Sequence, residues 1–389
     1  MADTPIFPPL DMERPIRTDV PLTDDEVLAD LPNLGAEDIE IEVVEDILPP
    51  DEEGNVIVAF GEEEVTDDSL QQDFYRNLSE DMDQRDLDQL ASQLIDNYKE
   101  DKESRKDWAN SYSEGLNLLG MDNEERTQPF QGATGVYHPL LSEAVAQFQA
   151  SAYKELLPAG GPVDTRIVGK ISPERTAQAA RVKDFMNYQI TEVMQEFDPE
   201  LDQMLFYLPL SGSAFKKIYY DETLNRAVSK FITSEDLVVP YETTDLLSAA
   251  RITHVIKMKT NDVRKLQLSG FYRDIELIPT SPDPSEITKK VDELEGLHPT
   301  KYLTPDIMTI LECHADLELI GYEELDETGE AIGIQSPYIV TLEEGCSKIL
   351  SIRRNWQEED ETQAKKQYFV HYKFLPGLGF YGFGLIHMI

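Results

Sequence analysis

The chain has 389 residues, enough for two or three domains and a sizeable hydrophobic core. It carries 76 acidic and 34 basic residues, a formal net charge of −42, which argues against proteins that wrap duplex DNA or bind anionic membranes. Because 40% of the residues are hydrophobic and 9% are aromatic, at least part of the chain must fold.

The acidic residues are concentrated at the N-terminus. Residues 1–70 hold 22 acids and only two bases, Arg14 and Arg17. Frequent prolines and repulsion between carboxylates predict that residues 1–65 form a disordered acidic arm. Within this arm, residues 39–48 alternate apolar and acidic side chains, so the segment could add a strand to the sheet edge of a partner.

Cysteine usage and the N-terminal residues indicate the compartment. The two cysteines, Cys313 and Cys346, are too few for a disulfide framework and fit a reducing cytosol. The first residues lack the basic flank and apolar run of a signal peptide, and no apolar stretch reaches the length of a membrane helix. We therefore expect a soluble protein that is synthesised inside the cell.

Residues 66–135 are expected to form a helical segment and a linker. Apolar residues recur every three or four positions from Leu70 to Tyr98, with charges between them. Gly115 and Gly120 are expected to end the helical part, and residues 123–135 are rich in Gln, Gly and Thr. A second, less charged helix is predicted over residues 140–157.

A short strand over residues 164–170 and a further helix are predicted next. Ser172 and Pro173 are typical of a helix start, because the hydroxyl caps free amides and proline suits the first helical position. This helix is expected to carry apolar residues on one face, together with Gln189, and the face consists of Val182, Phe185, Met186, Gln189, Ile190, Val193, Met194 and Phe197. Another helix is predicted over residues 200–208.

Strands dominate the rest of the chain, so the predicted fold class is α+β. The strands are expected at residues 215–220, 228–233, 237–239, 252–258, 307–319, 338–342, 348–352 and 368–374. A helix capped by Asn261 is expected over residues 261–268, and an acidic helical fragment within the loop 279–305. Strict alternation over residues 307–319 places Cys313 on one face and Glu312, His314 and Asp316 on the other.

The C-terminal run contains a pattern that resembles a dinucleotide-binding loop. Gly377, Gly379 and Gly382 have the spacing, but such a loop needs a helix to hold a pyrophosphate and an acid about 20 residues further on. The chain ends seven residues after Gly382, and bulky aromatic residues fill the loop. We therefore expect a tight glycine-aromatic turn that leads into a helix.

Other candidate chemistry is weaker. Glu312, His314 and Asp316 could hold a cation on one strand face, but a salt-bridged or solvated face is the commoner arrangement. Residues 326–330 lack the acid spacing of a calcium loop, and neither cysteine has neighbours that would activate it. We expect no catalytic residue, metal or cofactor, and no enzymatic activity.

This acidic chain contains two pairs of adjacent basic residues, which are Lys216 with Lys217 and Arg353 with Arg354. They either balance nearby carboxylates or form salt bridges between subunits. Copies with so much negative charge would need fixed pairs of this kind to hold together.

Several segments, in this order, resemble the portal (head–tail connector) proteins of tailed bacteriophages with short tails. They are residues 137–162, 210–217, 236–240, 351–356 and 371–385. The resemblance covers the chain from about residue 70 to its end. It implies a wing-type α+β region, and it makes Pro376, Gly377, Gly379, Gly382 and Gly384 the turn from the wing to the stem helix.

The resemblance also implies a division of the chain. Residues 1–65 would be the arm, 66–135 the helical segment and linker, 136–375 the wing-like domain, and 376–389 the turn into a truncated stem helix. Family members are much longer, so the stem, clip and crown would lie outside this sequence. Terminase docking and tail attachment would then depend on regions missing here.

The function implied is that of a structural subunit in a ring, usually dodecameric, at one vertex of the capsid. Genomic double-stranded DNA would pass through the ring during packaging and ejection without tight binding. The implied partners are further copies of the chain, the major capsid protein, terminase and tail adaptor proteins, with no membrane. The implied location is the virion, and the host cytoplasm during assembly. The alternative is an acidic scaffold or interaction protein that mimics nucleic acid through residues 1–65.

Overall fold

A computed structural model describes residues 74–119, 130, 139–221, 224–278, 285–297, 307–323, 332–360, 362–377 and 379–388. All of them belong to one compact unit, Val65–Ile389. The predicted arm, residues 1–65, and the predicted linker, residues 123–135, lie outside the described residues apart from Phe130.

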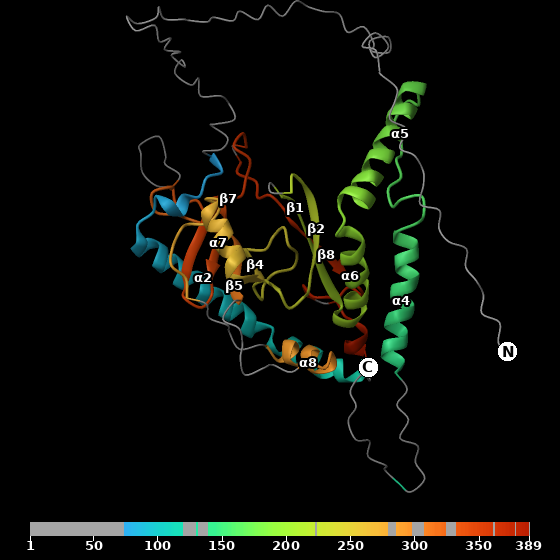
Figure 1. The fold of residues 1–389 in the computed structure, drawn as a ribbon, viewed down its shortest axis with the longest axis horizontal. Helices are drawn as coiled ribbons and strands as arrows, with labels where there is room; N and C mark the ends of the chain where they lie inside the picture. The colour runs from blue at the N-terminus through green and yellow to red at the C-terminus, as the bar shows by residue number, and fades with distance from the viewer. Residues whose placement is uncertain are drawn as a thin grey trace, which may run out of the picture. The chain divides into compact units, whose positions relative to one another are not determined.

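The described residues contain seven α-helices and two antiparallel sheets, which confirms the α+β class (Figure 1). The helices are α2 (Gln84–Ser104), α3 (Lys106–Leu116), α4 (Leu140–Leu156), α5 (Pro173–Tyr188), α6 (Phe197–Ser211), α7 (Thr260–Leu268) and α8 (Glu286–Leu294). Short 3-10 turns are η1 (Leu78–Glu80), η2 (Asn117–Leu119) and η4 (Leu385–Met388), and η3 (Gln189–Val193) is a π-helical turn. The strands are β1 (Ser213–Asp221), β2 (Arg226–Ile232), β3 (Leu237–Val238), β4 (Arg251–Lys259), β5 (Ile307–Leu317), β6 (Ser336–Glu343), β7 (Lys348–Arg354) and β8 (Phe369–Lys373).

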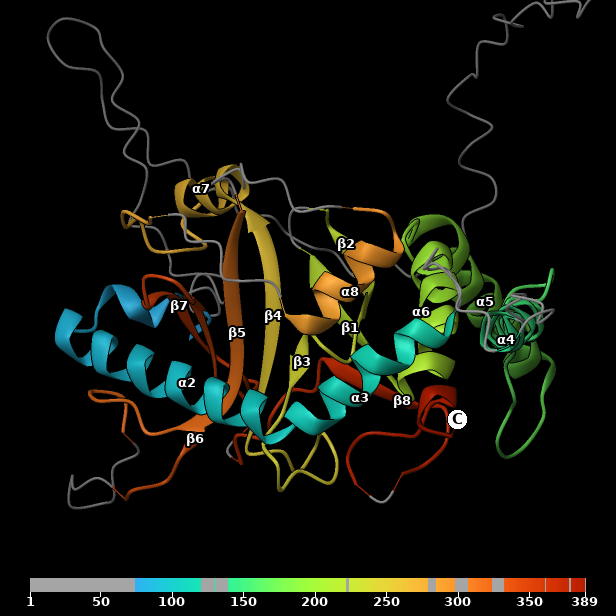
Figure 2. The same ribbon diagram turned by 90° about the horizontal axis from the view of Figure 1, so that it is seen from below.

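The larger sheet has five strands in the order β3-β4-β5-β6-β7. Helix α2 crosses one of its faces, as Figure 2 shows. Leu87, Ala91 and Leu94 of α2 pack there against Leu311 and Val340. The predicted alternation of β5 is therefore confirmed, because Cys313 belongs to this same buried cluster.

The opposite face of the larger sheet is also covered. Val263 of α7 packs against Met308 and Ile310 at one end of β5. Further along, Phe369 of the smaller sheet lies beside His314, with the ring centroids 5.0 Å apart. Glu312 and His314 of β5 are consequently enclosed between the two sheets, whereas Asp316, further along the strand, is exposed.

The smaller sheet has three strands in the order β2-β1-β8. Side chains of α6 pack on it, with Met204 and Leu205 in one buried cluster with Ala214 of β1. Helix α4 packs outside α6, and Phe148 joins the same cluster. Alternate residues of β1 thus face α6 or the larger sheet.

The edge strand β7 is blocked by one side chain. Asn77 donates from Nδ2 to the Leu350 carbonyl at 3.1 Å and accepts the Ile352 amide at 3.0 Å. It also accepts the Ser79 amide at 3.2 Å, so it caps η1 as well. These two contacts to β7 replace those that a further strand would make.

Three sequence predictions differ from the structure. Residues 164–170 form no strand, because no described strand pairs with their backbone; the bonds of Val163 with Asn187 and of the Thr165 hydroxyl with the Ala179 carbonyl hold the segment beside α5 instead. Asn261 is not the cap of α7, which begins one residue earlier, at Thr260, after Lys259. The extent of α6 also exceeds the predicted 200–208 at both ends.

Helix α5 begins as predicted but packs differently. The Ser172 hydroxyl accepts the Arg175 amide at 3.3 Å, and Pro173 occupies the first turn. No residue of α5 is buried, however, so its part of the predicted apolar face lies at the surface. The π-helical turn η3 and a break at Met194 interrupt the helix, so its apolar residues do not form one continuous stripe.

The C-terminal segment folds back as a turn against the end of α6. Leu375 and Phe383 form an isolated bridge, and the Gly382 amide donates to the Ser213 hydroxyl at 2.8 Å. Phe380 packs beside His371, with the ring centroids 4.6 Å apart. The predicted glycine-aromatic turn is therefore present, and it leads into the four-residue η4.

Close backbone approach explains the glycines of this turn. Gly212 ends α6 with a left-handed φ of 80°, and a Cβ there would lie 2.3 Å from the Gly382 carbonyl oxygen. A Cβ on Gly384 would lie 2.0 Å from the Leu210 carbonyl oxygen, and one on Gly377 would lie 2.5 Å from that of Tyr381. By contrast, Gly379 has no neighbour within 4 Å.

Replacing Gly384 by alanine tests this packing. The added methyl group would force the turn away from the Leu210 carbonyl, so we expect Gly384→Ala to lower the free energy of unfolding by about 2–4 kcal/mol. Denaturant titration of the full chain measures the change. Gly379→Ala is the matched control, and we expect it to stay within about 0.5 kcal/mol of the wild type. Equal effects of the two substitutions would contradict the packing argument.

Candidate functional site

The paired bases predicted from the sequence make contacts within the chain, and Lys217 makes the most consequential one. Its Nζ lies 2.5 Å from Oε1 and 2.7 Å from Oε2 of Glu312. Lys217 belongs to β1 and Glu312 to β5, so the ion pair joins the two sheets. His314 completes the group, with Nε2 2.7 Å from Glu312 Oε1. The salt-bridged alternative for the polar face of β5 is therefore confirmed at Glu312.

The enclosure of these groups shifts their pKa values. Burial alone would raise the pKa of Glu312, but Lys217 and His314 outweigh it and hold that pKa far below its usual value. Burial lowers the pKa of His314, against the opposing effect of Glu312. Burial likewise lowers the pKa of His254, which pairs with Glu312 in the β4–β5 register, to about 3. Around neutral pH Glu312 is therefore a carboxylate, and both imidazoles are neutral.

Lys216 faces the other side of β1 and is only 2% exposed. Its Nζ lies 4.2 Å from the centroid of the Phe197 ring, a cation–π distance. Burial lowers its pKa to about 8, although Glu200 and Glu196 oppose the shift. Of the four bases, Lys216 is thus the least accessible to another subunit.

Arg353 and Arg354 attach the segment before η1 to the end of β7. Arg353 donates to the Tyr75 carbonyl at 2.7 Å and to the Phe271 carbonyl at 3.1 Å. Arg354 donates to the Phe74 carbonyl at 2.7 Å and lies over the Phe74 ring. Within one chain these arginines bind backbone carbonyls, and an intersubunit role for the four bases stays a prediction.

Arg105 has a structural role that the sequence did not reveal. It lies between α2 and α3 and donates to the carbonyls of Ser234 at 2.6 Å, Leu237 at 3.0 Å and Glu235 at 2.5 Å. It also donates to the Tyr381 hydroxyl at 3.0 Å. One guanidinium thus connects the helical segment, the β2–β3 loop and the C-terminal turn. No local pattern marks it, because its partners lie more than a hundred residues away.

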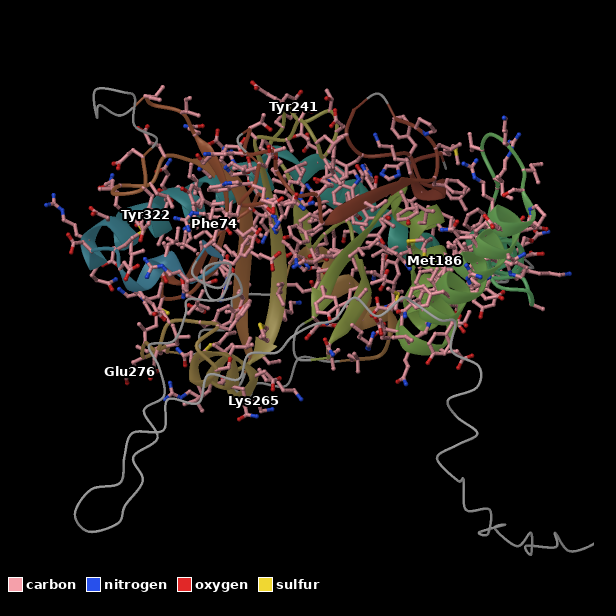
Figure 3. The ribbon with its side chains drawn as sticks, turned by 90° about the horizontal axis from the view of Figure 1, so that it is seen from above. Phe74, Met186, Tyr241, Lys265, Glu276 and Tyr322 are labelled. Carbon is pink, nitrogen blue, oxygen red and sulfur yellow. The ribbon has the colours of Figure 1, made fainter. Side chains whose placement is uncertain are left out.

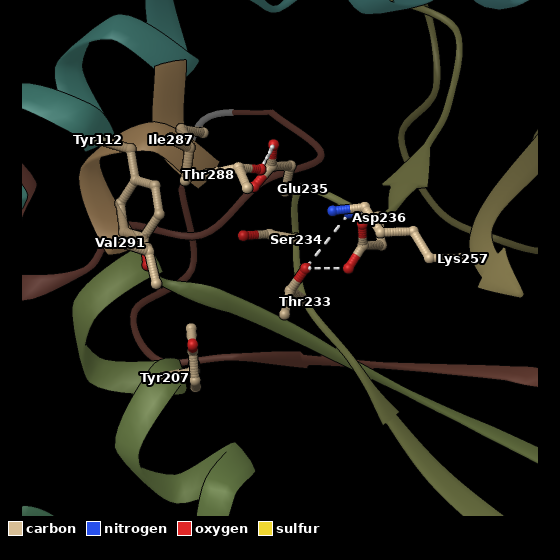
Figure 4. A pocket seen from close by; sticks show the side chains of 10 residues that line it. All are labelled: Tyr112, Tyr207, Thr233, Ser234, Glu235, Asp236, Lys257, Ile287, Thr288 and Val291. Carbon is tan, nitrogen blue, oxygen red and sulfur yellow. Dashed lines mark hydrogen bonds between the residues drawn. The ribbon is translucent and has the colours of Figure 1, made fainter. Parts of the chain in front are cut away.

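A cavity of about 210 Å³ lies beside this loop, and Figure 4 shows the side chains that line it. Asp236 accepts from the Thr233 hydroxyl at 2.8 Å, and burial raises its pKa. Glu235 accepts from Ser285 and Thr288 at the start of α8, where a carboxylate suits the helix dipole. The cavity is smaller than a typical small-molecule site, and its acids already serve the loop and α8.

The remaining sequence candidates are structural where the chain is described. Burial raises the pKa of Cys313 to about 12, and burial together with Glu343 raises that of Cys346 to about 11. The Gly382 amide donates to the Ser213 hydroxyl and the Gly384 amide donates to Nδ1 of His387. These two amides are therefore not free to bind a phosphate. No group of three metal-ligating side chains occurs among the described residues, and residues 326–330 lie outside them.

An exposed apolar face on α5 is the most distinctive surface feature. Phe185 is 60% exposed, and Val182, Met186 and Tyr188 are exposed as well. Figure 3 labels Met186 on this part of the molecule. Val168 and Ile171, in the segment that runs beside α5, are also largely exposed. Val182, Phe185 and Met186 are three and four residues apart and so lie on one side of the helix, and an exposed apolar patch of this kind indicates a protein-interaction surface.

Replacing Glu312 by glutamine tests the ion pair between the sheets. We expect Glu312→Gln to lower the free energy of unfolding by about 3–5 kcal/mol, because it leaves the Lys217 ammonium buried without a counter-charge. Denaturant titration at pH 7.5 measures the loss. The double variant Lys217→Met/Glu312→Gln is the control, and it should recover most of the loss because neither charge remains.

The same group should make the wild type sensitive to acid. His254 and Glu312 have pKa values below their ordinary 6.5 and 4.5, so their contributions are present above those values and are lost as the pH falls. We expect the free energy of unfolding to fall below about pH 6.5 and more steeply below about pH 4.5. The double variant should lose the steeper part. An unchanged profile in that variant would contradict the assignment to Glu312.

Among the described residues, no helix is long and apolar enough to span a bilayer. No protein-family model matches the chain, and no curated protein sequence matches it.

Proposed function

We propose that the chain is a structural subunit of a ring-shaped homo-oligomer of the phage portal type. Such a ring at a capsid vertex conducts double-stranded DNA during packaging and ejection and carries the tail. In this proposal the described α+β body is the wing-type region, and the turn at Pro376–Gly384 leads toward the stem. The major capsid protein, terminase and tail adaptor proteins are the proposed further partners.

The observation that carries the proposal is the exposed apolar face of α5. A helix of 16 residues with no buried residue gains little from packing within its own chain. Such a helix is better explained by a partner that covers Val182, Phe185 and Met186 in the assembled state. A subunit that functions only in an assembly has this property.

The charge of the chain supports a DNA conduit over a DNA-binding protein. A net charge of −42 repels phosphate, so a duplex could slide along an acidic wall without being held. The buried pairing of Lys217 with Glu312 also removes one of the bases from contact with nucleic acid. The second candidate function is an acidic scaffold or interaction protein, and the 22 acids of residues 1–70 favour it.

The size of the full chain in solution separates the two functions. The portal-type function predicts rings with a central hole in negative-stain images and a mass of about twelve times 44.2 kDa by light scattering. The function as an acidic scaffold or interaction protein predicts monomers of 44.2 kDa under the same conditions. Monomers at every concentration up to about 100 μM would overturn the portal proposal.

The conduit also predicts weak DNA binding. We expect no retention of duplex DNA by the full chain at about 0.15 M salt, because few bases are available to displace counterions. Fluorescence anisotropy with a labelled 30-base-pair duplex measures this, with a basic DNA-binding protein as the positive control. A sub-micromolar complex that weakens steeply with salt would contradict it.

A further inference from the structure

The exposed face of α5 is basic as well as apolar, in a chain that is otherwise strongly acidic. Residues 163–188 hold five bases and three acids. Arg181 lies four residues before Phe185 and seven before Tyr188, so all three lie on one side of the helix. Arg166, Lys170 and Arg181 are exposed and have no ion-pair partner among the described residues. We call this surface the α5 face.

A second exposed surface has the opposite charge. Residues 241–250 contain two exposed acids, Glu242 and Asp245, and no base. In the loop 241–247, Tyr241 is 84% exposed and Leu247 is 74% exposed, with Glu242 exposed between them. We call this surface the 241–247 loop. It combines carboxylates with two large apolar side chains.

The 241–247 loop is rigidly held. Asp245 accepts the amides of Leu247 at 2.8 Å and Ser248 at 2.9 Å, and these bonds lower its pKa. Leu246 and Ala249 are buried beneath the loop in the cluster around Phe215. A loop fixed in this way loses little conformational entropy when it binds.

The two surfaces lie on different parts of the same unit. Figure 3 shows Tyr241 and Met186 well apart, so one chain does not bring the surfaces together. The charges of the two surfaces are complementary, because the α5 face is basic and the 241–247 loop is acidic. Both surfaces also expose apolar side chains. A contact between different surfaces of identical chains is heterologous, and it produces a ring when the rotation between neighbours closes.

We infer that the α5 face of one copy docks on the 241–247 loop of the next copy. This inference rests on the proposed function, because it supplies the contact that links the subunits of the ring. Phe185 and Val182 cover Tyr241 and Leu247, and Arg181 faces Glu242. Duplex DNA or an anionic membrane would bind the α5 face less strongly than another copy of the chain, because the net charge of −42 repels phosphate around this face.

Truncation of the apolar anchors is the first test. Phe185→Ser and Tyr241→Ser should each raise the concentration at half-assembly about tenfold or more, measured by light scattering or mass photometry of the full chain. Leu268→Ser is the matched control, because Leu268 is 72% exposed on α7 and lies outside both surfaces. It should assemble like the wild type. Wild-type assembly by both anchor variants would overturn the inference.

A charge exchange tests the pairing itself. Arg181→Glu and Glu242→Arg should each assemble poorly alone, because each places like charges in contact. An equimolar mixture of the two should recover assembly, since each variant then meets its complement in the other. Arg85→Glu, on the exposed side of α2, is the control and should leave assembly unchanged. All the side chains substituted in these two tests are exposed, and equal denaturation midpoints would establish that the variants fold.

The outcomes separate this inference from the proposed function. Wild-type rings together with a mixture that does not recover would overturn the α5 pairing and leave the ring intact. Wild-type monomers would overturn both. Binding of a duplex or of anionic vesicles that Phe185→Ser abolishes, with assembly unchanged, would assign the α5 face to that other partner and overturn the inference.

Discussion

The ion pair of Lys217 with Glu312 is the constraint on which the arrangement of the two sheets depends. Removing a carboxylate and an ammonium from water is costly, and the cost is offset only when both remain in contact. The pair therefore fixes which face of β1 meets the larger sheet. That choice directs Lys216 and Ala214 toward α6, and the C-terminal turn then packs at the junction of α6 and β1.

Strong local patterns in the sequence predicted most of the β structure. The alternation at Cys313 and Glu312 and the two strands β6 and β7 are marked by neighbouring residues in the chain, so all three strands were recognised. The link between Lys217 and Glu312 spans 95 residues, and the contacts of Arg105 span still more, so no local pattern revealed them. The strand expected at residues 164–170 failed because a strand needs a pairing partner, whereas Asn187 and Ala179 supply other bonds there.

The prediction for α5 was correct for the start of the helix and did not specify what surrounds its apolar face. Capping by Ser172 is local chemistry, and the structure has it. Apolar periodicity indicates that a helix face will be covered, but it does not say by which chain. For Phe185 and Met186 the sequence alone could not distinguish an internal core from a surface for a partner. In the folded chain no residue of α5 is buried, so the described core does not cover this face.

Asn77 has a consequence for how copies of this chain can meet. By bonding Leu350 and Ile352 it occupies the free edge of β7, which would otherwise invite another strand to add. Pairing of the β7 edge with the β3 edge of another copy would grow without limit, because each added sheet presents a fresh edge. Asn77 already bonds the outward groups of Leu350 and Ile352, and the Arg273 amide also donates to Leu350, so growth through this edge is suppressed. Any contact between copies is therefore left to other surfaces of the chain.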